Sequence, residues 1–187
     1  MAKPYREVEI KYPIQNPEEI KARLAELGAK SLSTNELQED TYYVPAHRDF
    51  LEPRIVSEWL RIRRTGTKCS INYKLWLPVG AEIATHCDEY ESQVNDPEAV
   101  EKIFAALDMR EIARVHKVRS TWQIDDIEIA LDTVKGLGTF IELEAKSDSE
   151  DIEKIHTHLQ DALQKLAAKT LPQDHRGYPY QLLKRDR

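Results

Sequence analysis

Apolar and charged positions alternate strictly along the first segment of the chain, residues 5–12. One side of this segment carries the apolar residues Val8, Ile10 and Tyr12. The other side carries the charged residues Glu7, Glu9 and Lys11. A period of two residues predicts a β-strand with one apolar face and one fully charged face.

A helical period of apolar residues occurs three times. In the first predicted helix, Asn16 is the expected cap, Pro17 suits the first turn, and Gly28 ends the helix. The apolar stripe of this helix is Ile20, Leu24 and Leu27. The second helix has Asp96 as its expected cap, Pro97 in its first turn, and the stripe Val100, Ile103, Phe104 and Leu107. The third helix spans residues 149–169 and has the apolar stripe Ile152, Ile155, Leu159, Leu163 and Leu166. It precedes a tail, residues 171–187, that is rich in polar residues and prolines.

Further segments rich in β-branched and aromatic residues predict the other strands. They are residues 40–45, 59–64, 70–76, 88–94, 112–122, 124–132 and 139–145. A strand, a helix and three strands thus occur in this order twice, which predicts a pseudo-symmetric sheet of about eight strands. Gly136 and Gly138 predict a hairpin turn between the last two strands, because no strand-to-helix context surrounds them that would suit a phosphate-binding loop.

Charged residues of one sign gather on single faces of these strands. The pairs are Glu7 and Glu9, Arg61 and Arg63, Glu89 and Glu91, Lys117 and Arg119, and Glu142 and Glu144, while Lys74 and Asp132 stand alone on their strands. Like charges held side by side repel each other. At a solvated surface, ion pairs with neighbouring residues of opposite charge stabilise the fold too little to offset this repulsion. Because the opposite faces are apolar and helices are available to cover them, closing the sheet would line a central tunnel with charge. A solvated charged face is the simpler alternative on pattern alone.

An empty tunnel lined with like charges would cost folding free energy, because the charges repel each other. A polyanionic ligand with one or two metal ions would balance them. Lys and Arg suit phosphate oxygens, and paired carboxylates suit a hard cation. Magnesium or manganese fits best, because the sequence has no cluster of Cys and His with metal-ligand spacing.

Composition narrows the class of protein. The chain has 187 residues, of which 32% are charged and 41% hydrophobic, and this suits one globular domain. Its net charge of -6 argues against general binding to nucleic acid.

No apolar run approaches a membrane span, and the first residues lack the apolar core of a signal peptide, so we expect a cytoplasmic protein that does not bind membranes. Cys69 and Cys87 are expected to be reduced thiols.

Several sequence blocks resemble those of the CYTH superfamily, the triphosphate tunnel metalloenzymes. EVEIK, residues 7–11, matches the E-x-E-x-K signature of that superfamily. The blocks QEDTYYVP, LRIRR, INYK, KVR, LDTVKGLGTFIELE and GYPYQLL follow in order and resemble the branch of class IV adenylyl cyclase-like proteins. The resemblance covers nearly the whole chain. It implies an α+β fold in which residues 1–187 form a single CYTH-like domain, a closed eight-stranded antiparallel β-barrel with helices packed outside.

The same resemblance implies roles for individual residues. The metal ligands would be Glu7, Glu9, Glu142 and Glu144, with Asp132 near the metal or its waters. The triphosphate would be held by Lys11, Arg61, Arg63, Lys74, Lys117 and Arg119. Among these, Lys11, Lys74, Lys117 and Arg119 are expected to be catalytic. The roles of Glu89 and Glu91 stay open between metal binding and charge balance.

The resemblance leaves the reaction open. Class IV cyclases often carry a His-Phe pair shortly before E-x-E-x-K, whereas this chain has AKPYR there. We expect a metal-dependent enzyme that converts ATP to cyclic AMP and pyrophosphate or, alternatively, a triphosphatase acting on thiamine triphosphate or inorganic tripolyphosphate. A non-catalytic module that binds nucleotide or polyphosphate, and a barrel whose charges are merely structural, are further alternatives. No general base is evident, and nothing in the sequence decides whether the chain forms a homodimer.

The tryptophans and histidines have weaker signals. Trp122 shares an apolar strand face with Val118 and is expected in the core, whereas Trp59 and Trp76 stay open as residues that can stack on a nucleobase. We expect His156 and His158 at the surface; His47 lies in a polar loop and is expected to be exposed or, alternatively, to cap the tunnel mouth.

Overall fold

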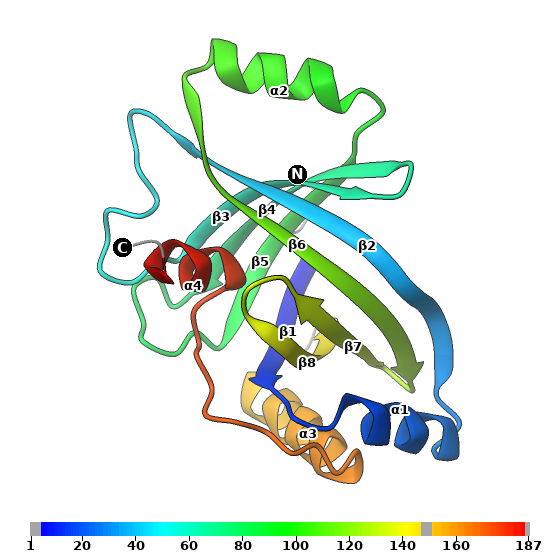
Figure 1. Ribbon diagram of the computed structural model, residues 1–187. Coiled ribbons are helices and arrows are strands. Elements are labelled where there is room, and N and C mark those ends of the chain that lie inside the picture. The colour runs from blue at the N-terminus through cyan, green and yellow to red at the C-terminus, as the bar shows by residue number, and fades with distance from the viewer. Residues whose placement is uncertain (1–4, 147–150, 186–187) are drawn as a thin grey trace.

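The protein is a closed barrel of antiparallel strands (Figure 1). A computed structural model describes residues 5–146 and 151–185. The strands are β1 (Tyr5–Pro13), β2 (Lys30–Pro45), β3 (Glu58–Thr65), β4 (Lys68–Leu77), β5 (His86–Gln93), β6 (Met109–Ile124), β7 (Ile127–Val134) and β8 (Gly138–Lys146). The helices are α1 (Pro17–Glu26), α2 (Pro97–Ala106), α3 (Ile152–Lys165) and α4 (Tyr178–Arg185). The strands close in the order β1-β5-β4-β3-β2-β6-β7-β8, which confirms the eight-stranded α+β barrel.

The two halves of the chain repeat the same order of elements, as the sequence predicts. A strand, a helix and three strands run from β1 to β4 and again from β5 to β8. The strands β2 and β6 are 16 residues long and pair with each other, so they join the two halves. The predicted strands 40–45 and 112–122 were too short. Most side chains in the first half of β2 are exposed, so no apolar alternation marks this part as a strand.

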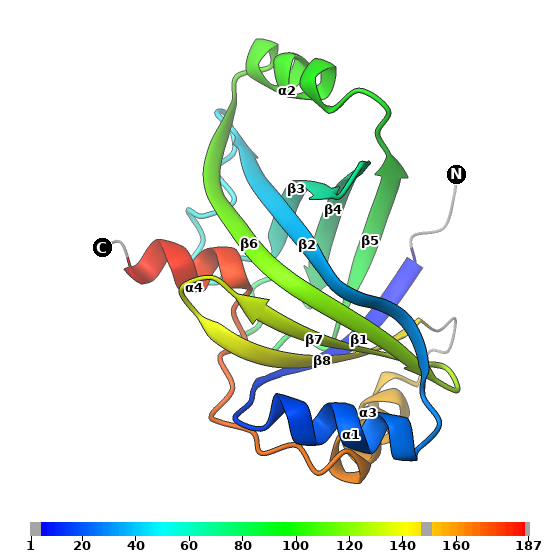
Figure 2. The ribbon, with the colours of Figure 1, turned by 45° about the vertical axis from the view of Figure 1, so that its right-hand side comes forward.

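The main core lies between the outer faces of β1, β7 and β8 and the helices α1 and α3, which lie beside each other below the barrel in Figure 2. Its buried members include Val8 and Ile10 of β1 and, from the predicted third stripe, Leu159, Leu163 and Leu166, against which the partly buried Ile152 and Ile155 pack. Because successive side chains of a strand point to opposite faces, burying Val8 and Ile10 outside directs Glu7, Glu9 and Lys11 into the barrel.

The predicted range 149–169 of the third helix is too long, since α3 spans Ile152–Lys165. Residues 149–150 lie outside the described part.

Of the two predicted helix caps, one is wrong and the other is confirmed. Asn16 precedes α1 as expected, but its side chain makes no capping bond to the helix. Instead Asn16 Oδ1 accepts from the backbone N–H of Lys169, and Nδ2 donates to the carbonyl of Ala167. Asn16 thereby ties the start of α1 to the segment after α3. Asp96 does cap α2, through the N–H of Ala99 at 2.9 Å.

The apolar stripes are also less buried than predicted. Leu27 is the C-cap residue that follows α1, and it is 38% exposed. In α2, only Phe104 is buried, whereas Ile103 and Leu107 are 54% and 64% exposed. α2 lies at one end of the barrel (Figure 2), where Phe104 packs against Tyr43 of β2. The barrel end therefore buries only part of this helix.

The predicted polar tail contains a helix. α4 follows the proline-containing segment and places Tyr178 in a second core cluster with Tyr42, Trp59, Val115, Val134 and Phe140. The ring of Tyr178 packs edge-on to Phe140, with 4.9 Å between ring centroids. The tail therefore closes over part of the barrel.

Smaller predictions agree with the structure. Gly136 and Gly138 form the turn between β7 and β8 and have positive φ angles of 83° and 109°, which favour glycine. Cys69 and Cys87 are free, buried thiols. In the described ranges, no helix has both the length and the apolar character needed to cross a membrane.

Candidate active site in the barrel tunnel

A cavity of about 600 Å³ occupies the inside of the barrel. Its wall contains every site residue named from the sequence except Asp132: Glu7, Glu9, Lys11, Arg61, Arg63, Lys74, Lys117, Arg119, Glu142 and Glu144. Glu89 and Glu91 also line it. The charged strand faces therefore point inward, and the alternative of a solvated charged face is excluded.

Carboxylates gather on the part of the wall made by β5, β1, β8 and β7. The register of the barrel places Glu9 of β1 directly opposite Glu144 of β8, and Glu144 opposite Glu128 of β7. Like charges directly opposite each other on neighbouring strands destabilise a sheet. This acidic wall therefore needs compensating positive charge inside the tunnel.

Three of these carboxylates form a compact cluster. Glu7, Glu9 and Glu144 each offer an oxygen, and these oxygens lie within 4.8 Å of one another. Burial, together with the neighbouring Glu89, raises the pKa of Glu7 to about 9, although Lys74 opposes the shift. A cation among the three carboxylates would favour the ionised form of Glu7.

The chemistry of this donor set fits a hard divalent cation. Carboxylate oxygens are the ligands that Mg²⁺ and Mn²⁺ prefer. The nearby thiol of Cys87 donates to Glu7 Oε2 at 3.5 Å, and burial raises its pKa, so it stays protonated and is not a thiolate ligand. The residues present therefore suit the divalent metal that the sequence resemblance implies.

Guanidinium and ammonium groups gather across the tunnel, on β3 and β6. Arg63 of β3 donates from Nε and Nη2 to both oxygens of Asp40 on β2, each at 2.7 Å. Arg119 of β6 makes the same kind of bidentate pair with Asp132 of β7, at 2.7 and 2.6 Å. Each buried aspartate fixes the plane of its arginine, so the basic wall is oriented before any ligand arrives.

Arg61 has unused hydrogen-bonding capacity on this wall. Its Nη1 donates to Asp40 Oδ2 at 3.3 Å, which is a longer contact than those of Arg63. Its Nε is buried and has no hydrogen-bond partner among the described residues. A buried donor without a partner is costly, and a bound anion would satisfy it.

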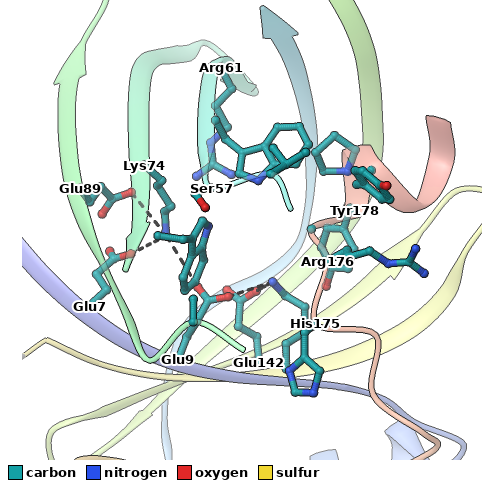
Figure 3. A pocket seen from close by; sticks show the side chains of 18 of the residues that line it. Glu7, Glu9, Ser57, Arg61, Lys74, Glu89, Glu142, His175, Arg176 and Tyr178 are labelled. Carbon is teal, nitrogen blue, oxygen red and sulfur yellow. Dashed lines mark hydrogen bonds and ion pairs between the residues drawn. The ribbon is translucent and has the colours of Figure 1, made fainter. Parts of the chain in front are cut away.

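Two lysines stand between the walls. The ammonium of Lys74 of β4 contacts Glu7 and lies 3.7 Å from carboxylate oxygens of both Glu9 and Glu89. Figure 3 draws the contacts of Lys74 as dashed lines. Lys11 of β1 bridges Glu9 at 3.0 Å and Glu142 at 2.9 Å. These ammonium groups partly neutralise the acidic wall. Nearby carboxylates raise the pKa of each lysine despite burial, so both stay charged.

The structure does not bring Asp132 to the carboxylate cluster. Asp132 is buried and accepts hydrogen bonds from Lys117, Arg119 and Tyr178. Glu142 likewise contacts Lys11 and Arg119 rather than the cluster. The geometry of the described residues thus favours Glu7, Glu9 and Glu144 as the metal-binding set, with Asp132 and Glu142 as partners of the cations.

Sequence reasoning missed three residues of the site. Asp40 lies in the block QEDTYYVP, but only the strand pairing reveals Asp40 opposite Arg63. Glu128 shares a strand face with Asp132, and this spacing could have identified it. Tyr178 lies in the block GYPYQLL; its hydroxyl donates to Asp132 at 3.1 Å, and its ring lies 4.8 Å from the ammonium of Lys11.

The tryptophans and the three histidines named from the sequence divide as the sequence suggests, whereas His175, which the sequence analysis did not consider, lines the cavity. Trp59 and Trp76 line the cavity, whereas Trp122 packs against the core beneath α1 and α3. His156 contacts the carbonyl of Thr85 and His158 contacts Asp126, outside the tunnel. His47 is exposed and is absent from the cavity wall.

Known proteins share both this sequence and this barrel. A protein of Methanocaldococcus jannaschii named "Putative adenylate cyclase" is 34% identical over 161 residues, which are 86% of this chain and 89% of the relative. A solved protein from Pyrococcus horikoshii OT3 has a TM-score of 0.80 at 28% identity, covering 96% of this chain and 99% of that one. A solved protein from Hippeastrum has a TM-score of 0.65 at 18% identity, covering 96% of each chain, and this likeness shows the fold alone.

The family model of the CYTH domain matches residues 5–178. This match spans all eight strands and extends to Tyr178, the residue that reaches Asp132 from the C-terminal segment. The chain therefore belongs to the CYTH domain family.

Proposed function

We propose that this chain converts ATP to cyclic AMP and pyrophosphate inside its barrel, in a reaction that requires Mg²⁺ or Mn²⁺. The observation that carries this proposal is the opposition of two walls across one cavity. A three-carboxylate cluster lies on one side, and oriented guanidinium groups lie on the other. A metal-bound polyphosphate matches both walls at once. The name of the Methanocaldococcus relative supports a cyclase.

Each wall has a separate task in this reaction. Glu7, Glu9 and Glu144 would hold the metal, which supplies charge neutralisation at the phosphate oxygens. Arg61, Arg63, Lys117 and Arg119, with Lys11 and Lys74 nearer the carboxylates, would bind the phosphate oxygens. Asp40 and Asp132 keep the arginines in place, so little reorganisation accompanies the reaction.

Cyclisation needs the ribose 3′-oxygen in line with the bond from the α-phosphorus to the leaving pyrophosphate. The pyrophosphate gains negative charge as that bond breaks, and the basic wall stabilises this charge. Lys11, Lys74, Lys117 and Arg119 are the residues that we propose as catalytic, because they line the cavity from three different strands. We propose further that residues 1–187 form one domain around this site.

A triphosphatase is the second candidate. The residues before the E-x-E-x-K block lack the His-Phe pair of many class IV cyclases. The Hippeastrum protein is described as having a dominant triphosphatase activity, and it shares the barrel with this chain. In this reaction a water molecule would attack the terminal phosphate, and the same basic wall would stabilise the leaving diphosphate.

Phosphorus NMR separates these reactions. Purified protein is incubated with ATP, and in parallel with tripolyphosphate, in Mg²⁺ or Mn²⁺. Cyclic AMP and pyrophosphate from ATP are the expected products. Orthophosphate release would instead establish the triphosphatase, and unchanged spectra of both compounds would contradict an enzymatic role.

Binding of a triphosphate at pH 8 is expected to take up a proton at Lys117. Burial, followed by the neighbouring Arg119, lowers the pKa of Lys117 to about 7, so this amine is mostly neutral at pH 8 in the free protein. A bound phosphate favours the ammonium form and raises that pKa. Calorimetric titrations with tripolyphosphate in the absence of a divalent metal, which would ionise Glu7 and release a proton, should therefore reveal proton uptake in buffers with different ionisation enthalpies, and Lys117→Met should abolish it. The same binding enthalpy in every buffer would contradict this prediction.

A further inference from the structure

One buried hydrogen-bond acceptor beside the basic wall has no partner. Gln38 of β2 is 9% exposed, and its Oε1 makes no hydrogen bond to any described residue. Ser33 Oγ and Thr41 Oγ1 also lack partners, but a hydroxyl can donate as well as accept. An amide oxygen can only accept, so Gln38 Oε1 requires a donor. Burying this oxygen without one costs folding free energy.

The register of the barrel places Gln38 beside Lys117. Gln38 pairs directly with Lys117 of β6, and the β2–β6 pairing is regular from residue 36 to residue 42. The side chain of Gln38 therefore shares a face of β2 with Asp40 and with Tyr42, which lines the cavity. Directly opposed residues on antiparallel strands have Cβ atoms about 5 Å apart. The ammonium of Lys117 is thus the cavity-lining cation within reach of Gln38 Oε1.

Lys117 has spare donor capacity. Its Nζ donates to Asp132 Oδ2 at 3.0 Å. The same oxygen accepts from Arg119 Nη2 at 2.6 Å and from the hydroxyl of Tyr178 at 3.1 Å, so it is fully used. A protonated lysine carries three donors. One can go to Asp132 and one to a bound phosphate, which leaves the third for Gln38 Oε1.

A bound phosphate increases the need for this third acceptor. Burial, followed by Arg119, lowers the pKa of Lys117 to about 7, and a phosphate favours the ammonium form. The groups that face Lys117 from neighbouring elements include Asp132 of β7, Arg63 of β3, Asp40 of β2, Glu142 of β8 and Tyr178 of α4. Gln38 Oε1 therefore suits the phosphate-bound state, in which Lys117 is charged.

We infer that Gln38 is a positioning residue for Lys117: its amide oxygen accepts from the Lys117 ammonium and holds that ammonium against the bound phosphate. This inference rests on the proposed function, because it needs a phosphate at Lys117. It adds a neutral side chain to a site otherwise built from ionic residues and one tyrosine. The cost of leaving Oε1 without a donor falls on the free protein and disappears when the phosphate binds.

Calorimetric titration with tripolyphosphate at pH 7 tests this role. The titrations are made without a divalent metal and again with Ca²⁺, which binds phosphate oxygens without demanding strict geometry. Gln38→Met keeps the length of the side chain but removes the acceptor, and it should weaken binding about tenfold. Gln123→Met is the matched control, since Gln123 is exposed on the strand of Lys117 and is absent from the cavity wall. It should leave the affinity unchanged.

Thermal unfolding separates a positioning role from a structural one. Gln38→Met removes a buried acceptor that has no partner, so the free variant should unfold at the same temperature as the original protein or higher. The rise in unfolding temperature caused by tripolyphosphate should nevertheless be smaller in the variant. A residue that merely supports the fold would instead lower the unfolding temperature of the free protein. Gln38→Leu provides a second variant without an acceptor.

A double-mutant cycle assigns the effect to Lys117. In a protein that already carries Lys117→Met, the further change Gln38→Met should alter the affinity for tripolyphosphate by less than about twofold. Unchanged affinity in both Gln38 variants, or the same tenfold loss with Lys117→Met present, would overturn the positioning role while leaving the triphosphate tunnel intact. Absence of tripolyphosphate binding by the original protein, with and without the metal, would refute the proposed function and this inference together.

Discussion

Glu9→Gln is expected to lower metal-dependent turnover by about 100-fold or more. Glu9 contributes one of the three clustered carboxylates and lies opposite Glu144 in the barrel register. Glutamine keeps the size of the side chain but removes the negative charge that a divalent cation requires. The rate is measured against Mn²⁺ concentration, and the variant should also need more metal to reach half of its own maximal rate.

The control for Glu9→Gln is Glu98→Gln. Glu98 lies in the first turn of α2, exposed and outside the tunnel. This change should leave both the rate and its metal dependence unaltered. Retention of normal turnover by a folded Glu9→Gln variant would contradict the assignment of the metal to this wall.

Arg61→Met is expected to weaken binding of tripolyphosphate by about 10- to 100-fold. The buried Nε of Arg61 has no hydrogen-bond partner in the described part of the chain. The free protein has therefore already lost the hydration of this N–H group, and binding of a phosphate that accepts from it carries no further desolvation cost there. Asp40 keeps its bidentate partner Arg63 in this variant, which limits damage to the fold. Calorimetric titration gives the dissociation constant directly.

The neighbouring residue Arg64 supplies a matched control. Arg64 lies on the opposite face of β3 and donates to Glu101 of α2 at 2.8 Å. Arg64→Met removes the same charge from the same strand, so an effect of net charge alone would weaken binding equally. We expect unchanged affinity for Arg64→Met, and similar losses in the two variants would contradict a direct role of Arg61.

The sequence was informative wherever a period of two residues sorted side chains by face. Glu7 and Glu9 could be assigned to the tunnel because Val8 and Ile10 demanded an apolar partner on the other side. Arg61 and Arg63 were found in the same way. The repeated order of elements, together with the family resemblance, then led to the closed barrel.

The partners of these residues could not be predicted in the same way. Asp40 holds Arg61 and Arg63 only because β2 pairs with β3 in a particular register, and a single sequence does not reveal register. Tyr178 begins a helix of eight residues in a segment rich in polar residues and prolines, and it reaches Asp132 only after the tail has folded back. Its helical pattern is too short to stand out.

The separation of Asp132 from the carboxylate cluster of Glu7, Glu9 and Glu144 has a similar cause. The sequence shows that Asp132 faces inward, but not that Lys117 and Arg119 occupy the neighbouring strand and pair with it. The exposure of Ile103 and Leu107 likewise depends on how little barrel surface lies beneath α2. In both cases long-range packing decides the outcome.

A crystal structure of the protein with Mn²⁺ and tripolyphosphate would show whether the two walls hold a metal and a triphosphate together. The anomalous signal of manganese locates the ion independently of the phosphate density. We expect manganese among Glu7, Glu9 and Glu144, with phosphate oxygens on the metal and against Arg61, Arg63 and Arg119. Manganese bound away from these carboxylates, or tripolyphosphate bound outside the barrel, would contradict it.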